Sequence, residues 1–273
     1  MQNNIKELKK EFNKIKNLSL NKSLRSGTTG IGYTFETLLN KQEDSSYHPD
    51  FKGIEIKTQL GYTKSALTLF TLTPIKNNDR STKYILENFG YPDKNNKGFK
   101  TFKGDVFYNK NNLIAYKYIF KTKIDYKRKI LRLIILNCDF EVINESIYWN
   151  LSDIKERLFT KLNYLAYIKG YPYKKDNEIY YKYTNINIYK LKDFNIFLEL
   201  LKKDIIYIKF NISIFKNEKR YGQIQDRGTA FLIKNSNLND LFDIIEWFFI
   251  FEVAYILYIS LGTRVKKNNT LVS

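Results

Sequence analysis

Cysteine and histidine each occur only once in this sequence of 273 residues. The single cysteine, Cys138, excludes a disulfide within the chain and any zinc site built from several cysteines. The single histidine, His48, excludes a metal site with several histidine ligands. Cys138 closely follows the apolar run 130–136, so we expect a buried, unreactive thiol. We expect His48 to be an ordinary loop residue, with a phosphate contact or a supporting role beside Asp50 as the alternative.

Long apolar segments are also scarce. The most apolar one, 247–261, contains Glu252 and is shorter than the roughly 20 apolar residues that a membrane-spanning helix needs. We therefore expect an apolar closing helix over residues 238–260. The N-terminus lacks a secretory signal pattern, and its apolar residues recur at helical spacing among lysines from Ile5 to Leu18, which predicts an amphipathic helix. We expect a soluble, cytoplasmic protein that does not associate with membranes.

Acidic residues are few relative to basic ones. The chain has 46 Lys and Arg against 28 Asp and Glu, which gives a net charge of +18. This balance favours a polyanionic partner such as nucleic acid or an anionic membrane surface. Part of the lysine excess accompanies abundant Asn, Ile and Tyr, as an A/T-biased coding sequence would produce. With 43% apolar residues the chain can nevertheless bury a substantial core.

One short segment combines features that suggest chemistry. Residues 49–57 read PDFKGIEIK, which predicts a strand end, a tight turn and a second strand. Because strand side chains alternate between faces, Glu55 and Lys57 should lie together, and the turn should return Asp50 to their side. Two carboxylates suit Mg²⁺, and a lysine beside them can hold a water or steady charge on a phosphate. The alternative is an exposed strand with ordinary alternating charges.

A glycine-rich loop, 26–32, precedes this segment and leads into a predicted helix over residues 33–40. The loop lacks the Gly-Lys-Ser/Thr ending of a Walker motif, and no convincing strand precedes it as in a dinucleotide fingerprint. Glu36 lies on the predicted helix. It is either a solvated surface acid or a further acid near Asp50 and Lys57.

Taken together, three segments resemble the MvaI/BcnI group of type II restriction endonucleases, which are relatives of the nickase MutH within the PD-(D/E)xK nuclease class. Residues 30–39 read GIGYTFETLL, residues 45–57 read SSYHPDFKGIEIK, and residues 64–71 read KSALTLFT. The resemblance implies an α/β fold with a central mixed sheet flanked by helices, and two lobes around a DNA cleft. It also implies Mg²⁺-dependent hydrolysis, with Asp50 and Glu55 as metal ligands, Lys57 positioning or activating water, and Glu36 as the helix-borne acid.

A second informative segment is RYGQIQDRGTAF at residues 220–231. Arginine can bind guanine in a bidentate fashion and aspartate can accept from cytosine, although Asp-Arg-Gly is also a common turn composition. An Asp-x-Gly-Thr-x-Phe pattern in it is similar to a segment of the resembled family that reads G·C pairs. The family has histidines around that segment, where this chain has Gln225 and Arg227, which puts the target sequence in doubt. The residues that we expect to contact DNA are Arg220, Tyr221, Asp226, Arg227 and Thr229.

From the residues and the resemblance together, we expect a catalytic lobe at about 1–140 and a DNA-recognition lobe with the closing helix at 141–273, or one continuous domain. The expected activity is sequence-specific cleavage of double-stranded DNA that leaves 5′-phosphate ends. The resemblance suggests a monomer without an obligatory protein partner, and a short site of the CCNGG type. A MutH-like strand-nicking enzyme and a non-catalytic DNA-binding module are the alternatives. Clustered acids facing a phosphate backbone argue against the second, unless a cation neutralises them.

The remaining pattern predicts several further elements. Apolar periodicity predicts helices over 82–89, 151–167 and 191–203. Short apolar or alternating runs predict strands over 101–108, 113–121, 130–136 and 205–215. Residues 171–183 are rich in Tyr and Lys, a composition that suits contact with nucleic acid but also follows from the coding bias.

Overall fold

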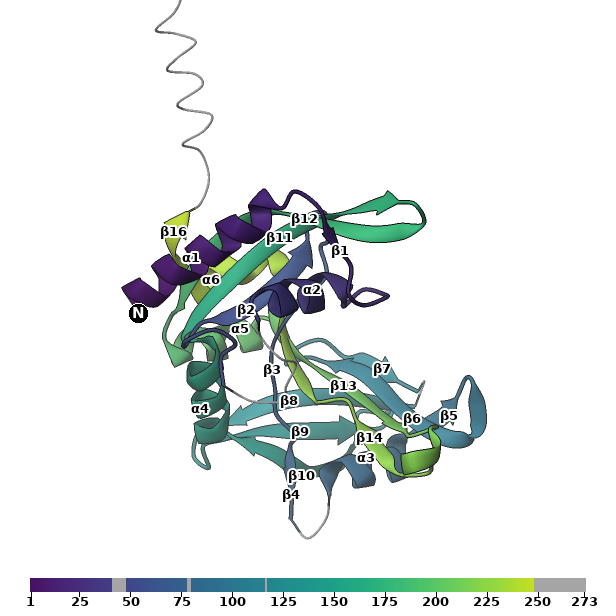
Figure 1. Ribbon diagram of the computed structural model, residues 1–273. Helices are drawn as coiled ribbons and strands as arrows, with labels where there is room; N and C mark the ends of the chain where they lie inside the picture. The colour runs from purple at the N-terminus through teal and green to yellow at the C-terminus, as the bar shows by residue number, and fades with distance from the viewer. Residues whose placement is uncertain (41–47, 78–79, 116, 248–273) are drawn as a thin grey trace, which may run out of the picture.

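The computed structural model describes residues 1–40, 48–77, 80–115 and 117–247. Within them the chain has a mixed α/β fold with three β-sheets, and it forms two lobes (Figure 1). Among the described helices none is long and apolar enough to cross a membrane.

The first lobe is built on a sheet with the strand order β1-β12-β11-β2, and β16 also pairs with β12. Its strands are β1 (Asn21–Lys22), β2 (Glu55–Leu60), β11 (Tyr164–Lys175), β12 (Glu178–Leu191) and β16 (Phe242–Trp247). Helices α1 (Gln2–Asn17) and α2 (Gly30–Leu38) cover one face of this sheet. The apolar stripe of α1, including Leu8 and Phe12, packs with Ile54 and Ile56 in one buried cluster.

The second lobe contains the other two sheets. One has β3 (Leu67–Thr71), β15 (Ala230–Ile233), β13 (Ile206–Ile214), β6 (Asn96–Val106) and β5 (Tyr91–Asp93), with β14 (Ile224–Asp226) beside β13. The other has β4 (Ile75–Lys76), β10 (Val142–Asn150), β9 (Ile130–Leu136), β8 (Tyr118–Asp125) and β7 (Asn112–Ile114). Helix α3 (Ser81–Phe89) packs beside them. Buried aromatic rings join the two sheets, since Phe102 of β6 contacts Phe120 of β8 and Phe210 of β13 contacts Trp149 of β10.

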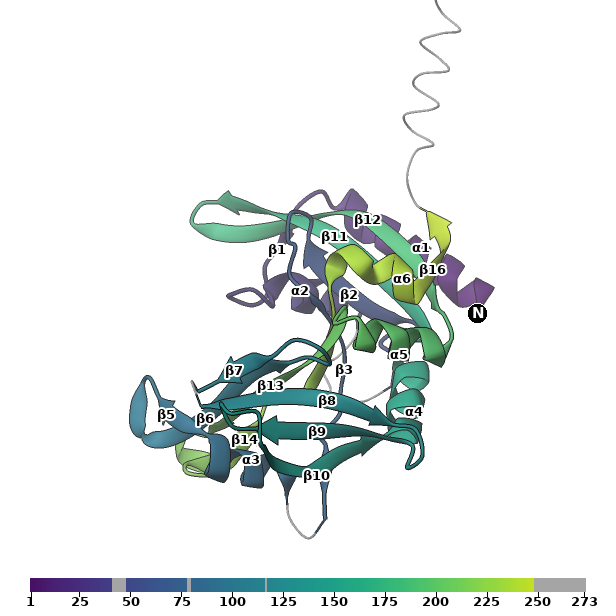
Figure 2. The same ribbon diagram turned by 180° about the vertical axis from the view of Figure 1, so that it is seen from behind.

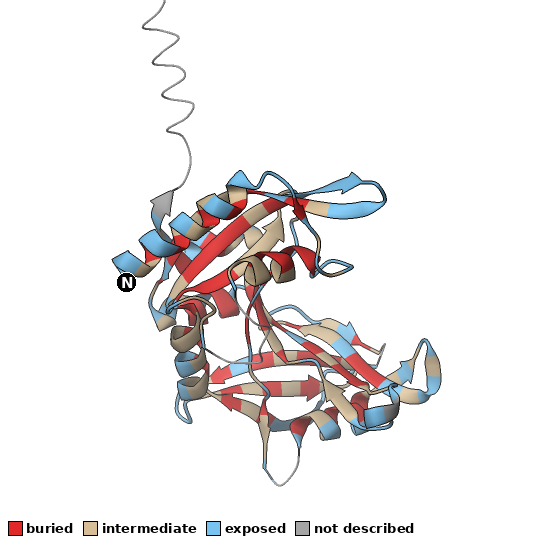
Figure 3. Cartoon of the chain, viewed as in Figure 1, coloured by how far each residue is buried: buried red, intermediate tan, exposed pale blue. Residues whose placement is uncertain are grey.

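Three helices lie near the junction of the lobes (Figure 2): α4 (Leu151–Leu162), α5 (Phe194–Lys202) and α6 (Leu238–Leu241). Their apolar side chains belong to the large core cluster of the second lobe, which also takes in Leu165 and Tyr189 from the first sheet. Figure 3 shows the buried positions as red bands along the strands of both lobes. The junction is therefore a packed apolar contact.

The division between the sheets does not coincide with a single boundary near residue 140. Strand β2 pairs in parallel with β11, and a parallel pair needs a long crossover connection. Here the connection contains β3 to β10 together with α3 and α4, so most of the second lobe is inserted between two neighbouring strands of the first. Strands β13 to β15 then return to the second lobe.

Most of the predicted elements are confirmed. The amphipathic N-terminal helix is α1, and the helices expected at 82–89 and 191–203 are α3 and α5. The strand expected at 130–136 is β9, with the same bounds, and the one expected at 205–215 is β13. The helix expected over 151–167 ends at Leu162, because the residues from Tyr164 onward pair with β2 and β12 as β11.

Two expectations about the end of the chain and the thiol are wrong. The closing helix expected over 238–260 ends at Leu241, and Phe242–Trp247 instead pair with β12. Phe242 is buried and Asp243 is exposed, which is the alternation of a strand. Residues 248–260, and the basic tail after them, lie outside the described residues. Cys138 is exposed, because β9 ends at Leu136 and the thiol lies in the turn that follows.

Candidate active site and candidate base-recognition segment

The turn before β2 places the first acid beside the strand. Phe51 and Ile54 exchange two backbone hydrogen bonds of 2.9 and 2.8 Å, which closes a two-residue turn. Lys52 and Gly53 both have positive φ, at 44° and 88°, as this kind of tight turn requires. The chain therefore doubles back, and the backbone N–H of Ile56 donates to Oδ2 of Asp50 at 3.0 Å. Asp50 is thus held by the strand that carries the other acid.

Alternation along β2 separates the apolar residues from the charged ones. Ile54 and Ile56 are buried in the cluster beneath α1 and α2. Glu55 and Lys57 point to the other face, where Nζ of Lys57 donates to Oε1 of Glu55 at 2.6 Å. The structure therefore brings together Asp50, Glu55 and Lys57 as the sequence pattern predicts.

Glu55 is an unusual carboxylate, because only 1% of its side chain is exposed. Burial raises the pKa of Glu55 above its ordinary value, and the nearby charge of Asp50 adds to this, whereas Lys57 and Lys161 lower it. The other carboxylate oxygen, Oε2, is buried and has no hydrogen-bond partner within the described part of the chain. An ionised carboxylate with a bare oxygen is costly unless a cation approaches it.

Lys161 is a residue of this site that the sequence reasoning missed. Its Nζ lies 3.3 Å from Oε1 of Glu55, and its side chain is 17% exposed. Lys161 is on the last turn of α4, three residues after the buried Leu158 and seven after the buried Ile154. A lysine on the buried face of an amphipathic helix is the signal that could have found it. Two ammonium groups, from β2 and from α4, thus flank one carboxylate oxygen.

Glu36 lies on α2 and lines a cavity of about 800 Å³. The cavity is lined by α2 and the loop before it, by β2 and by the β2–β3 connection, and both Glu36 and Lys57 contribute to its wall. Asp50 and Glu55 are not among the lining residues, so Lys57 connects the cavity to the buried acid beside it. Glu36 is half-buried. Burial raises the pKa of Tyr183, and the charges of Tyr181 and Glu36 add to this effect.

The two acids at β2 are suited to a divalent cation. Among the described residues there is no group of three or more His, Cys, Asp or Glu side chains that could hold a metal ion by themselves. A hard cation such as Mg²⁺ needs only one or two carboxylates, since it keeps several waters and takes further oxygens from a phosphate. The bare Oε2 of Glu55, with Asp50 nearby, provides that donor set. Glu36 does not join them in the described arrangement.

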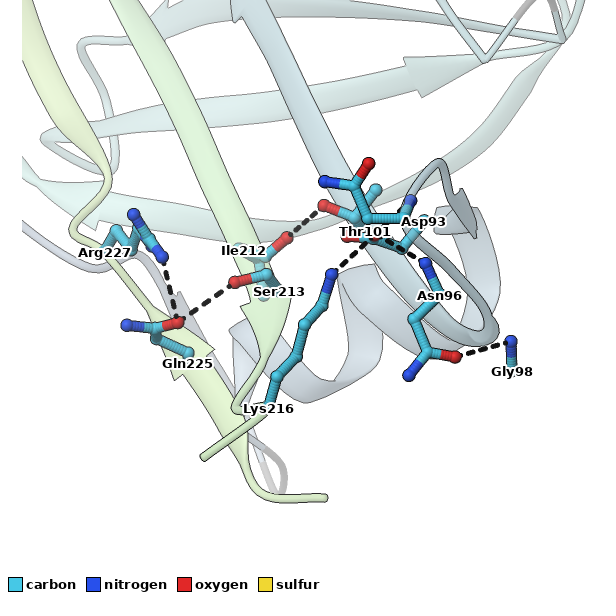
Figure 4. A network of polar contacts seen from close by, with 10 residues as sticks. Asp93, Asn96, Gly98, Thr101, Ile212, Ser213, Lys216, Gln225 and Arg227 are labelled. Carbon is cyan, nitrogen blue, oxygen red and sulfur yellow. Dashed lines mark hydrogen bonds and ion pairs between the residues drawn. The ribbon is translucent and has the colours of Figure 1, made fainter. Parts of the chain in front are cut away.

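The candidate base-recognition segment forms the edge of the second lobe, where β14 pairs with β13 (Figure 4). Oε1 of Gln225 accepts from the Arg227 guanidinium and from the Ser213 hydroxyl, each at 3.4 Å. Asp226 is fixed by the backbone N–H of Gly228 at 2.8 Å and by the hydroxyl of Thr73 at 3.2 Å. One guanidinium N–H of the exposed Arg227 is therefore held by an amide, and most of its other donors are still available.

The other expected contact residues lie in different surroundings. Arg220 and Tyr221 are exposed at the far end of the β13–β14 connection, where the Arg220 guanidinium lies 4.0 Å from the centre of the Phe215 ring. Thr229 is fully buried, and its hydroxyl has no hydrogen-bond partner within the described residues. A buried hydroxyl cannot reach a base, so Thr229 supports the segment from inside the lobe.

A family model and two solved structures match this chain. The model of the MvaI/BcnI restriction endonuclease family matches residues 9–242. The fold is similar to a structure of restriction endonuclease MvaI in complex with its cognate DNA substrate, with a TM-score of 0.81, 29% sequence identity, and coverage of 89% of this chain and 98% of that one. It is also similar to MvaI in the absence of DNA, with a TM-score of 0.57, 29% identity, and coverage of 89% and 97%. No curated protein matches the chain significantly.

Proposed function

Since this chain belongs to the MvaI/BcnI restriction endonuclease family, we propose that it is a type II restriction endonuclease that hydrolyses phosphodiester bonds at a short specific sequence in double-stranded DNA. The observation that carries this proposal is the buried Glu55, paired with Lys57 and placed beside Asp50. A solved relative of similar fold, MvaI, has been captured on its cognate DNA. The net charge of +18 supplies the attraction that DNA binding needs.

Asp50 and Glu55 are the residues that would hold Mg²⁺. Oε2 of Glu55 has no other partner in the described structure, and Oδ1 of Asp50 is the oxygen that the backbone of Ile56 does not occupy. When bound, the ion lowers the pKa of water and neutralises charge that develops on the phosphate. A bound cation would also offset the free-energy cost of burying an ionised Glu55. This is the physical reason why these side chains fit a cation.

Lys57 is the residue that would position the attacking water. Its ammonium has three donors, and the bond to Glu55 uses only one of them. The remaining donors face the cavity that Lys57 lines, where they can hold a water or stabilise the negative charge of the pentacovalent phosphate. Lys161, on α4, lies 3.3 Å from the same Glu55 oxygen and would keep Glu55 oriented. Glu36, which lines the same cavity, would act on a proton or orient a water.

The base-recognition segment would read the DNA from the second lobe. Arg227 is exposed and anchored by Gln225, and Asp226 is fixed by two hydrogen bonds, which is the arrangement of side chains that meet base edges in a defined register. Arginine suits guanine and aspartate suits cytosine, so a G·C-containing site of the CCNGG type is our proposal for the target. Arg220 and Tyr221 would contact the backbone.

One active site per chain can cut only one strand of the duplex in each event. We expect the protein to act as a monomer without a protein partner, and to cut one strand of the duplex at a time, leaving 5′-phosphate and 3′-hydroxyl ends. Its expected place of action is the cytoplasm. A nicked intermediate should therefore accumulate before the linear product.

The test is to incubate the purified protein with a plasmid of known sequence and Mg²⁺, and to map the ends that form. Discrete fragments with 5′-phosphates at a recurring short sequence would support the proposal. Cleavage of a single strand that requires an added activating protein would favour the MutH-like alternative. Tight binding with no cleavage in any divalent cation would leave only a DNA-binding module and would overturn the proposal.

A further inference from the structure

Strands β11 and β12 form a hairpin that extends beyond the sheet to which they belong (Figure 1). β11 pairs with β2 only from Leu165 to Gly170, and β12 pairs with β1 only at Tyr180 and Tyr181. The two strands nevertheless remain paired with each other as far as Lys175 and Glu178. The tip is exposed over its whole length (Figure 3). Nothing in the proposed chemistry uses this extension.

The register of the hairpin shows which of its residues share a face with the active site. Lys57 of β2 lies opposite Tyr167 of β11, and residues directly opposite each other point to the same side of a sheet. Alternation along β11 then places Lys169, Tyr171, Tyr173 and Lys175 on the face of Lys57. We call the extension of this face beyond the sheet, which consists of Tyr171, Tyr173, Lys175, Glu178, Tyr180 and Lys182, the hairpin inner face.

The burial of the neighbouring residues on β12 agrees with this assignment despite an irregularity in the pairing after Lys169. Tyr181 and Tyr183 are buried in the cluster beneath α1 and α2, which lies on the opposite face of the sheet. The residues between and beside them, Tyr180 and Lys182, therefore point to the inner side. Lys174 and Ile179, which face each other near the tip, point to the outer side.

The hairpin inner face is cationic and carries phenolic hydroxyls. Tyr171 and Tyr173 are 39% and 46% exposed, and Lys175 and Lys182 are exposed as well. The acid on this face, Glu178, is neutralised by Lys22 at 2.6 Å. Ammonium and hydroxyl groups are the usual partners of phosphate oxygens in DNA backbones.

The base of the hairpin is held in a fixed place relative to β2. The ring of Tyr171 lies directly over Gly61, where a side chain would collide with it. Gly61 follows the last residue of β2, and its N–H donates to the carbonyl of Gly170 at 2.9 Å. The hairpin inner face therefore begins at a fixed place beside the active-site surface.

We propose that the hairpin inner face binds the DNA backbone outside the recognised bases, as a clamp on the flanking duplex. This inference rests on the proposed function, because it takes the scissile phosphate to lie at Lys57. Tyr173 is six residues beyond Tyr167, which amounts to about 20 Å of strand, so the contact lies at most about six base pairs from the scissile phosphate. Phosphates carry no sequence information, and the clamp therefore adds affinity without changing the target.

The first test needs no known target. Binding to a long random-sequence duplex is measured as a function of salt for the full chain and for Lys175→Ala and Lys174→Ala, two variants with the same loss of charge on opposite faces of the hairpin. Loss of one phosphate contact should make the dependence of log K on log salt shallower by about 0.9 for Lys175→Ala, while Lys174→Ala keeps the slope of the unmodified chain. Equal slopes for the two variants would overturn the clamp.

The second test locates the contact. Two duplexes contain the mapped cleavage site, one with flanks shorter and one with flanks longer than about six base pairs. Their binding affinity is measured for the Lys57→Ala protein and for the Lys57→Ala protein that also carries Tyr173→Ala. Tyr173→Ala should weaken binding severalfold on the long duplex only, and an equal loss on both duplexes would contradict the assigned position. Plasmid cleavage by unmodified protein separates the two proposals. Absence of site-specific cleavage refutes the proposed function, whereas normal cleavage with no flank effect refutes only the clamp.

Discussion

The ammonium of Lys161 on α4 lies 3.3 Å from the same Glu55 oxygen that Lys57 binds at 2.6 Å from within β2. Glu55 and Lys57 lie on β2 and Lys161 lies on α4, so β3 to β10 separate the two segments along the chain. The two lysines lower the pKa of Glu55, which burial and Asp50 raise. The site therefore depends on the packing of α4 against the sheet as well as on the motif itself.

Replacing Lys161 should impair cleavage and change its pH dependence. Lys161→Met removes a charged contact, and a contact of this kind is worth about 1.5–3 kcal/mol, so we expect cleavage near neutral pH to fall by about tenfold to a hundredfold. Because Lys161 lowers the pKa of Glu55, its removal raises that pKa further, and the acidic limb of the pH–rate profile should move to higher pH. Lys155→Met, on the exposed face of the same helix, is the control. An unchanged profile for Lys161→Met would make Lys161 a structural residue only.

Lys57→Ala should abolish Mg²⁺-dependent cleavage while DNA binding survives. The lysine donates to Glu55 and lines the cavity, and loss of one positioned donor at a developing negative charge typically costs about 10²–10³ in rate. Cleavage rates and binding constants are measured for the same preparation. Lys52→Ala is the control, because Lys52 is exposed and pairs with Glu7 on α1. Parallel loss of binding and of thermal stability would mean that Lys57 supports the fold rather than the reaction.

Ionisation of Glu55 should lower the free energy of unfolding of the protein when no divalent cation is bound. The pKa of Glu55 in the folded state is raised, so its protonated form favours folding, and this contribution is lost as the pH rises through the folded-state pKa. The free energy of unfolding of the unmodified protein, relative to Glu55→Gln, should therefore decrease with rising pH. Urea unfolding at several pH values measures this difference.

Magnesium should restore this stability at neutral pH without any DNA. A cation at 100 times its dissociation constant stabilises the folded state by about 2.7 kcal/mol. We expect Mg²⁺ to raise the Tm of the unmodified protein and to leave the Tm of Glu55→Gln and Asp50→Asn nearly unchanged. Identical shifts in all three proteins would place the cation elsewhere.

Arg227→Ala should relax the recognised sequence. An arginine that binds guanine contributes about 1–3 kcal/mol of discrimination, so cleavage at the proper site should fall and cleavage at sites with one changed base pair should become comparable. Arg220→Ala, at the other end of the connection and stacked on Phe215, should weaken binding equally for all sequences. Sequencing of the plasmid ends from both variants measures the two effects. A preserved target preference in Arg227→Ala would remove this residue from base recognition.

The sequence was sufficient to predict the local parts of this site. Alternation along β2 and the Lys52–Gly53 turn are determined by neighbouring residues, so the meeting of Asp50, Glu55 and Lys57 followed from spacing alone. The family resemblance, carried by residues 30–71, agrees with the family match over residues 9–242.

What the sequence could not predict depends on contacts between distant segments. Lys161 reaches Glu55 only because β11, which follows α4, pairs in parallel with β2. Phe242–Trp247 looked like the start of an apolar helix, but pairing with β12 makes it a strand. The burial of Thr229 likewise depends on the pairing of β15 with β3, which no local pattern reveals.

The central claim is that Asp50 and Glu55 together hold the catalytic cation. The most direct measurement is a crystal structure of the protein soaked with Mn²⁺, with anomalous scattering used to locate the ion. We predict an anomalous peak in contact with carboxylate oxygens of both Asp50 and Glu55. The claim would be contradicted if the protein used for the crystal cleaves DNA but the peak lies at other residues, with Glu55 still bound only by Lys57 and Lys161.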